Sequence, residues 1–144
     1  MKNVNVLSHE IMPLIKEHLD QGQEVFLTVS GQSMRPFYHH QETVVKLVKP
    51  TFPIALYTVC LFHDQGGYKL HRLIKKNDEM LIMNGDALKA IETIREDQIL
   101  GVVTEHEYQH KKISSTNKRY MFYVRIWALL RPFRRIMLRI FGGK

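Results

Sequence analysis

Apolar side chains recur at intervals of three and four residues near the beginning of the chain. This spacing is typical of an amphipathic helix: the recurring apolar positions are Ile11, Leu14, Ile15 and Leu19, and His18 shares their face. Pro13 is compatible with the first turn of such a helix, and Gly22 ends the pattern. We predict one helix over residues 8–21 that covers the rest of the domain.

From residue 24 onward the pattern changes to short runs rich in Val, Ile, Leu, Thr and aromatic residues, separated by turn residues. Such runs predict six β-strands, over residues 24–29, 43–48, 56–62, 68–74, 79–83 and 99–104. Gln65-Gly66-Gly67 separates two of them, and glycine accepts the positive φ of a hairpin turn. The strand that holds Cys60 should therefore pair with the strand that holds His71. Together these features predict a mostly β domain with its core over residues 24–104.

Beyond Lys111 the pattern becomes helical. Residues 120–130 are nearly all apolar, and after Pro132 apolar and basic side chains alternate at helical spacing. One face would carry Phe133, Ile136, Met137, Ile140 and Phe141, and the other Arg131, Arg134, Arg135 and Arg139. We therefore divide the chain into a β domain over residues 1–110 and a basic amphipathic helical tail over residues 111–144.

The tail also accounts for the charge of the protein. The 144 residues carry 21 basic and 14 acidic side chains, which gives a formal net charge of +7. Ten basic and no acidic side chains lie in residues 111–144, so the net charge of residues 1–110 is −3. Segregated charge favours a segment that binds an anionic surface, whereas an even spread would favour nucleic-acid binding. We expect no nucleic-acid partner.

No apolar run approaches the ~20 residues that a bilayer crossing needs. A helix with an apolar face, an arginine face and aromatic residues near its start is typical of one that lies in a membrane surface. We expect residues 119–141 to bind an anionic membrane surface; alternatively, this helix packs on the β domain or on a partner. Because the first residues carry no export signal, we expect a cytoplasmic protein at the inner face of the membrane.

Length and composition limit the chemistry further. At 144 residues and 44% hydrophobic, the chain is expected to form one globular domain with a core. The single cysteine, Cys60, cannot form a disulfide within the chain or supply a four-cysteine zinc site. We expect neither a metal nor another cofactor.

A candidate nucleophile follows the first predicted strand. Gly31 permits a sharp exit from the strand and Pro36 fixes the departing backbone, so the Ser33 hydroxyl would be held exposed in a set direction. The alternative is a serine in an ordinary loop turn. A serine nucleophile needs a base. Of the eight histidines, only His63 and His71 lie in or beside the central strands.

His71 lies in the middle of the strand predicted over residues 68–74, where it is either a catalytic base or a buried structural histidine. Asp86 follows Gly85 just after the strand predicted over residues 79–83. A carboxylate at such a strand end can orient an imidazole and stabilise its charged form. Taken alone, Asn84-Gly85-Asp86 is simply a turn.

The order and spacing of these elements resemble the serine peptidase group of the signal peptidases and the LexA-type repressors. That group carries a Gly-x-Ser-Met-x-Pro box, matched here by Gly31-Gln32-Ser33-Met34-Arg35-Pro36. Its archaeal and endoplasmic-reticulum branch has a histidine directly before an arginine in a later strand, matched by His71-Arg72. A Gly-Asp pair then follows, matched by Gly85-Asp86. The resemblance covers roughly residues 24–104 and implies a signal-peptidase/LexA-like catalytic β domain.

The resemblance implies roles for individual residues. Ser33 would attack a peptide carbonyl, His71 would act as general base and acid, and Asp86 would hold the imidazole in place. Glu92 stands where the eukaryotic branch has a second acid, so it could share or take the orienting role. Lys69 is an alternative base, since Ser-Lys pairs also work.

The same resemblance implies an oxyanion donor and a substrate groove. The backbone N–H of Ser33 is the expected oxyanion donor. The groove residues would be Gly31, Gln32, Met34, Pro36 and Arg72. A peptide or protein substrate in extended conformation would bind there as an additional strand.

The leading hypothesis is a serine endopeptidase that cleaves a leader or signal-like peptide. Signal peptidases usually have an amino-terminal membrane anchor, which we do not find in the first residues, so the tail would take its place. The alternative is a catalytically inactive peptide-binding or membrane-recruitment module of the same fold. A self-cleaving repressor is disfavoured, because the roughly 23 residues before the first strand are too few for a DNA-reading helix-turn-helix unit.

Overall fold

The computed structural model describes residues 10–133, 136 and 138–142. The helices in this part are α1 (Met12–Asp20) and α2 (Lys118–Leu129), with short turns η1 (Glu96–Gln98), η2 (Arg131–Phe133) and the π-helical η3 (Leu138–Gly142). The strands are β1 (Val25–Thr28), β2 (Val44–Val48), β3 (Val59–Asp64), β4 (Gly67–Asn77), β5 (Met80–Asn84), β6 (Ile91–Arg95), β7 (Ile99–Tyr108) and β8 (Lys111–Ser114). The predicted mostly β class is confirmed.

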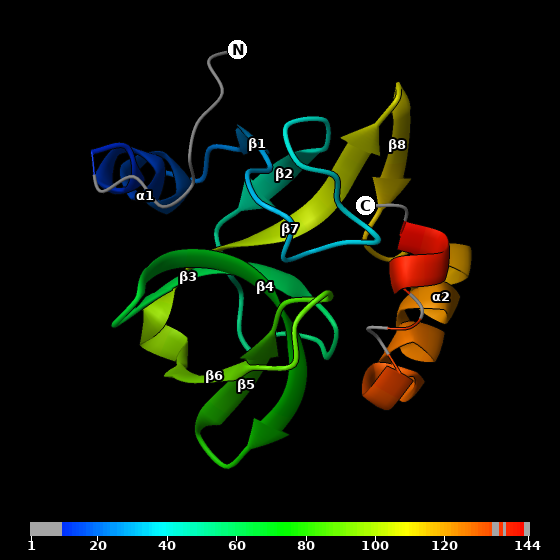
Figure 1. Cartoon of the computed structure of the whole chain (residues 1–144). Coiled ribbons are helices and arrows are strands. Elements are labelled where there is room, and N and C mark those ends of the chain that lie inside the picture. The colour runs from blue at the N-terminus through cyan, green and yellow to red at the C-terminus, as the bar shows by residue number, and fades with distance from the viewer. Residues whose placement is uncertain (1–9, 134–135, 137, 143–144) are drawn as a thin grey trace.

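These strands belong to one antiparallel sheet that bends over itself. Their order is β1-β2-β7-β3-β4-β5-β6, with β8 added to β7. In Figure 1, β1, β2, β7 and β8 form the upper part, and β3 to β6 form the lower part. Helix α1 lies at the left beside the upper part, and α2 lies at the right.

Two hydrophobic cores hold this sheet together. In the first, Met12, Ile15 and Leu19 of α1 pack against buried residues of β1, β2 and β7. The predicted helix is therefore confirmed over α1, and Ile15 and Leu19 of its predicted face are buried, whereas Leu14 and His18 are exposed. Residues 8 and 9 of its predicted range lie outside the described residues. The second core is built mainly from β3 to β6 and comprises Ile54, Cys60, Phe62, Leu73, Leu81, Met83, Ile94 and Ile99.

The predicted hairpin between β3 and β4 is confirmed. Cys60 pairs with His71, and Asp64 pairs with Gly67 across the turn. Gly67 has a φ of +105°, which a residue without a Cβ adopts without strain. The Asp64 carboxylate also accepts a 2.7 Å hydrogen bond from the N–H of Gly66. This turn fixes the register that places His71 in the middle of the sheet.

Strands β6 and β8 lie outside the six predicted strands. Only Ile94 of β6 is buried, and none of the four residues of β8 is. Strand β6 is defined by its pairing with β5, and β8 by its pairing with β7. Neither β6 nor β8 carries a continuous apolar face. Short polar edge strands leave little signal in the hydrophobic pattern.

The predicted tail is wrong at its beginning, because Lys111–Ser114 forms β8 instead of helix. A division at residue 110 would thus separate two paired strands. Helix α2 begins after Asn117, whose side chain accepts the N–H of Tyr120 at 2.9 Å and so caps the helix. Of the helix predicted after Pro132, Arg134, Arg135 and Met137 lie outside the described residues. In the part of the chain that the structure describes, no helix is long and apolar enough to cross a membrane.

Candidate active site

Hydrogen bonds to neighbouring loop residues hold the turn that carries Ser33. The N–H of Val29 donates to the carbonyl of Thr43 at 2.8 Å, which extends the pairing of β1 with β2. Gly31 then leaves the strand with a φ of +97°, and its N–H donates to Nδ1 of His40 at 2.7 Å. The sharp strand exit predicted at Gly31 is therefore present.

The loop after β5 fastens this turn from the other side. The carbonyl of Ser33 accepts a 2.9 Å hydrogen bond from the N–H of Ala87. A Cβ at Gly85 would lie 2.8 Å from that carbonyl oxygen and 3.0 Å from Nε2 of His71. Only a residue without a side chain fits there. Gly85 thus allows the serine turn and the imidazole to approach the same small volume.

His71 reaches this volume from the middle of β4. Its side chain is 5% exposed, and its Nδ1 forms a 2.8 Å hydrogen bond with Oε1 of Glu92 on β6. Since a carboxylate only accepts hydrogen bonds, Nδ1 is the donor and Nε2 keeps the lone pair in the neutral ring. The basic nitrogen of His71 therefore lies on the side of Gly85 and the serine turn.

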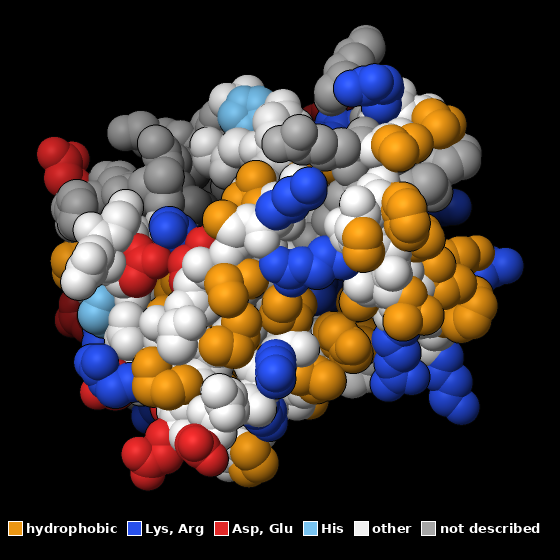
Figure 2. All heavy atoms as spheres, turned by 60° about the horizontal axis from the view of Figure 1, so that its bottom comes forward, with side chains coloured by type: hydrophobic (Ala, Val, Ile, Leu, Met, Phe, Trp, Pro, Cys, Tyr) orange, Lys and Arg blue, Asp and Glu red, His pale blue; other side chains and the backbone are white. Residues whose placement is uncertain are grey.

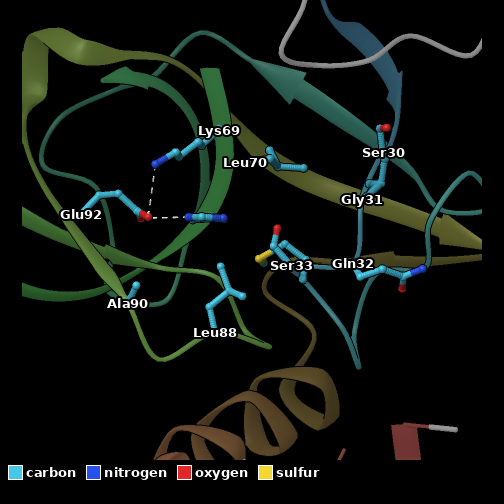
Figure 3. Close-up of a pocket in the computed structure, with 12 residues that line it drawn as sticks. Ser30, Gly31, Gln32, Ser33, Lys69, Leu70, Leu88, Ala90 and Glu92 are labelled. Atoms are coloured by element: carbon cyan, nitrogen blue, oxygen red, sulfur yellow. Dashed lines mark hydrogen bonds and ion pairs between the residues drawn. The ribbon is translucent and has the colours of Figure 1, made fainter. Parts of the chain in front are cut away.

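Ser33 and His71 line one cleft of about 410 Å³. Figure 3 shows Ser33 on one side of the cleft and Glu92 with Lys69 on the other, while Leu88 and Ala90 lie beneath them. The hydroxyl and the N–H of Ser33 form no hydrogen bond with any residue that the structure describes. Ser33 thus lines the cleft with its hydroxyl and N–H not engaged by another described residue.

Asp86 does not orient His71, contrary to the prediction. Its two carboxylate oxygens accept hydrogen bonds from Nε and Nη2 of Arg72 at 2.9 and 2.8 Å. Successive residues of a strand point to opposite faces, so Arg72 points away from the cleft that its neighbour His71 lines. Asp86 follows Arg72 to that opposite face.

The Arg72–Asp86 pair is a structural element. Each residue is 2% exposed, and Arg72 also donates to the carbonyl of Tyr57 at 2.9 Å and to the hydroxyl of Tyr120 at 3.0 Å. Burial disfavours the charge on Arg72, but the adjacent carboxylate outweighs this effect and raises the pKa of Arg72 above its ordinary value. Arg72 was expected among the residues of the substrate groove, and this prediction is wrong, because its side chain does not line the cleft.

Glu92 occupies the position expected of the orienting acid. While its Oε1 bonds to His71, its Oε2 lies 3.6 Å from Nζ of Lys69, and that ammonium lies 3.1 Å from Oδ2 of Asp64. Its side chain is 10% exposed. Lys69 contacts two carboxylates, which favour its charged form. This arrangement suits a role as a cation that positions Glu92, and it is less suited to a role as the base for Ser33.

The expected groove residues divide between two places. Gly31, Gln32 and Met34 line the cleft, as does Ser30, which the sequence did not single out. Pro36 instead lines a separate pocket on the side of α2, together with His106. Pro36 is therefore not among the residues that line the cleft.

Helix α2 supports the loop after β5, so for this part of the tail the alternative that the helix packs on the β domain is confirmed. The indole Nε1 of Trp127 donates to the carbonyl of Asp86 at 2.6 Å. Nη2 of Arg131 donates to the carbonyl of Lys89 at 2.7 Å, and the ring of Phe37 meets the Trp127 ring edge-on at 6.5 Å. The first part of the tail therefore packs on the β domain and supports a loop that lines the cleft.

Other reactive groups do not complete a site of their own. Burial raises the pKa of the Cys60 thiol to about 12, so it stays protonated at neutral pH. Burial and the positive charge of Arg72 lower the pKa of His106 to about 4. Among the described residues, no group of three His, Cys, Asp or Glu side chains is arranged to hold a metal ion.

Comparisons with protein-family models, with curated proteins and with solved structures find no match to this chain.

Proposed function

We propose that the protein is a serine endopeptidase in which Ser33 is the nucleophile, His71 the general base and Glu92 the acid that orients it. One observation carries this proposal. The turn of Ser33 and the Nε2 of His71 meet at Gly85, in one cleft, while Nδ1 of the same ring is held by a carboxylate. The proposal is supported because a nucleophile, a base and an orienting acid, the three groups that acyl transfer requires, line one cleft, with the Ser33 hydroxyl not hydrogen-bonded to the ring in the unliganded protein.

The chemistry would run in two halves. Oγ of Ser33 attacks the scissile carbonyl, and Nε2 of His71 accepts the hydroxyl proton while Glu92 stabilises the imidazolium. The tetrahedral oxyanion accepts a hydrogen bond from the N–H of Ser33. As the C–N bond breaks, His71 returns the proton to the leaving amine. Water, deprotonated by His71, then hydrolyses the acyl-serine and restores the hydroxyl.

The shape of the cleft favours an extended peptide as substrate. Ser30, Gly31 and Gln32 line the cleft on the side of the serine turn, and Leu88 and Ala90 line it below (Figure 3). The apolar side chains of Val29, Leu70 and Leu88 line the cleft together with Ser33. Together with the resemblance to signal peptidases, this supports cleavage of a leader or signal-like segment. The signal-peptidase/LexA-like form of the fold is part of the same proposal.

The test compares the wild type with Ser33→Ala and His71→Ala. We expect wild-type protein to cleave leader-like peptides and to react with a serine-directed phosphonate probe, and both variants to lose these reactions. Ser30→Ala is the matched control, because it removes a hydroxyl from the same cleft and should retain activity. If the wild type binds leader peptides as Ser33→Ala does, but neither cleaves them nor reacts with the probe, the protein is an inactive peptide-binding module.

A further inference from the structure

The outer face of α2 carries large apolar side chains that the protein leaves exposed. Phe122, Ile126 and Leu129 follow one another at helical spacing, and Leu129 is 80% exposed. Phe133, Ile136 and Ile140 continue the exposed apolar series beyond the helix. Single exposed apolar residues are ordinary, but six large ones along one face of a helix and the segment that follows it indicate an interaction surface. We call these six residues the outer apolar face.

The inner face of α2 explains why the domain itself does not cover these residues. Tyr120, Val124 and Trp127 are buried, and the hydroxyl of Tyr120 and the indole of Trp127 are hydrogen-bonded to the Arg72–Asp86 region. These bonds fix the rotation of the helix about its axis. The α2 part of the outer apolar face, Phe122, Ile126 and Leu129, is thereby turned away from the sheet.

Basic side chains flank the outer apolar face. Lys118, Arg119, Arg125 and Arg139 are exposed, and none of them forms an ion pair with an acidic residue in the described part of the chain. The sequence contains no acidic residue after Glu107. Figure 2 shows this combination, with hydrophobic and basic side chains together on the right and most of the visible acidic side chains on the left.

We propose that the outer apolar face docks on an anionic lipid bilayer surface, with α2 lying in the plane of that surface and its flanking arginines and lysines contacting lipid phosphates. The positive charge around the outer apolar face favours a lipid surface over a second copy of the chain. A second copy docked through the same face would place the two sets of cations against each other. A bilayer surface offers both an apolar layer for Phe122 and Leu129 and anions at the level of Arg119 and Arg125.

This surface is independent of the chemistry proposed for the cleft, but it bears on where that chemistry occurs. Trp127 and Arg131 hold the carbonyls of Asp86 and Lys89, in the loop that also lines the cleft. A docked α2 would keep that loop, and hence the cleft, close to the lipid surface. Substrates tethered to the same membrane would then reach Ser33 preferentially.

Co-sedimentation of the full chain with vesicles tests the docking surface. We expect binding to vesicles of phosphatidylcholine mixed with phosphatidylglycerol, and much weaker binding to phosphatidylcholine alone or at high salt. Combining Phe122→Ser with Leu129→Ser should weaken binding by at least about tenfold. The matched control is Phe26→Ser, which removes a similarly exposed aromatic ring from β1 and should not change binding.

Charge variants give a second, independent measurement. Replacing Arg119 and Arg125 by Gln should weaken binding to anionic vesicles by about fivefold per residue. Replacing Lys75 and Lys76, which are exposed on β4, should have little effect. Equal binding to neutral and anionic vesicles, or binding that these variants leave unchanged, would overturn the proposal. So would a concentration-dependent dimer that the Phe122 and Leu129 variants dissolve.

These results are separable from those of the peptidase test. Ser33→Ala should bind anionic vesicles as the wild type does, because Ser33 lies in the cleft and not on the outer apolar face. Loss of vesicle binding with cleavage retained would refute only the proposed docking surface. Vesicle binding without peptide cleavage would refute only the proposed peptidase activity.

Discussion

Exchanging Glu92 and Asp86 for amides, one at a time, separates catalysis from stability. In Glu92→Gln the side chain keeps its size, but the charge that faces Nδ1 of His71 across 2.8 Å is lost. The imidazolium that forms during attack by Ser33 is then no longer stabilised, and the amide can also select the wrong tautomer. We expect kcat to fall by ~10²- to 10⁴-fold, which corresponds to about 3–5 kcal/mol of barrier.

Asp86→Asn should act on folding instead. The Asp86 carboxylate accepts two hydrogen bonds from Arg72, and both groups are almost completely buried. Removing one partner leaves an uncompensated buried charge, which typically costs about 3–5 kcal/mol of unfolding free energy. Glu92→Gln should cost only about 1–2 kcal/mol, because the side chain is near the surface and the hydrogen bond to His71 can persist.

The assay pairs turnover of a leader-like peptide with denaturant unfolding followed by the fluorescence of Trp127, the single tryptophan. Rates are measured on protein that is fully folded by this criterion, so that stability does not enter kcat. The reasoning is refuted if Asp86→Asn is as stable as the wild type but inactive while Glu92→Gln retains activity. In that case Asp86 would be the orienting acid and the contacts described above would not be those of the working enzyme.

Three further predictions concern residues around the cleft. Lys69→Met should lower kcat by about tenfold and leave KM nearly unchanged, because the substitution only loosens the position of Glu92. Lys69→Arg keeps the positive charge and should retain most of the wild-type rate. Equal losses in both variants would contradict a positioning role for Lys69. Gly85→Ala should lower the unfolding free energy by about 1–3 kcal/mol and reduce probe labelling, because its Cβ has no room; a fully active variant of wild-type stability would exclude the close approach. The folded state holds His106 neutral, with a pKa lowered to about 4, whereas the unfolded chain takes up the proton near its ordinary pKa. The contribution of neutral His106 to the unfolding free energy is therefore complete above about pH 6.5, and roughly 3 kcal/mol of it is lost as the pH falls toward 4. In His106→Phe, the unfolding free energy should depend less on pH over this range.

Strands with a buried apolar face could be predicted from the sequence, and edge strands could not. Strands β1 to β5 and β7 each carry apolar runs that match the predicted ranges within a few residues. The ladder with β7 is what makes Lys111–Ser114 a strand, and no residue of that segment is buried. A pairing of this kind depends on the partner strand, so the local pattern gives no sign of it.

The serine turn and the histidine could be predicted because their signals are local. A glycine at the strand exit and a histidine in the middle of a strand are visible in the order of residues alone. The choice of acid is not local, because it depends on the register of β5 with β6, which places Glu92 opposite Met83. Strand alternation held a usable clue, since Arg72 must point away from the face that His71 occupies and so competes for Asp86.

Helix α2 shows why an almost uniformly apolar segment does not reveal its own orientation. Residues 120–130 offer apolar side chains on every face, so periodicity cannot say which face is buried. The polar atoms decide this, because a buried tyrosine or tryptophan needs a hydrogen-bond partner, and the Arg72–Asp86 region provides one for Tyr120 and one for Trp127. Phe122 and Leu129 bring no polar atom that requires a partner, and they lie outside. Deleting the tail would therefore remove the partners of a buried ion pair together with the outer apolar face, and only point variants on that face can report on membrane binding by a folded protein.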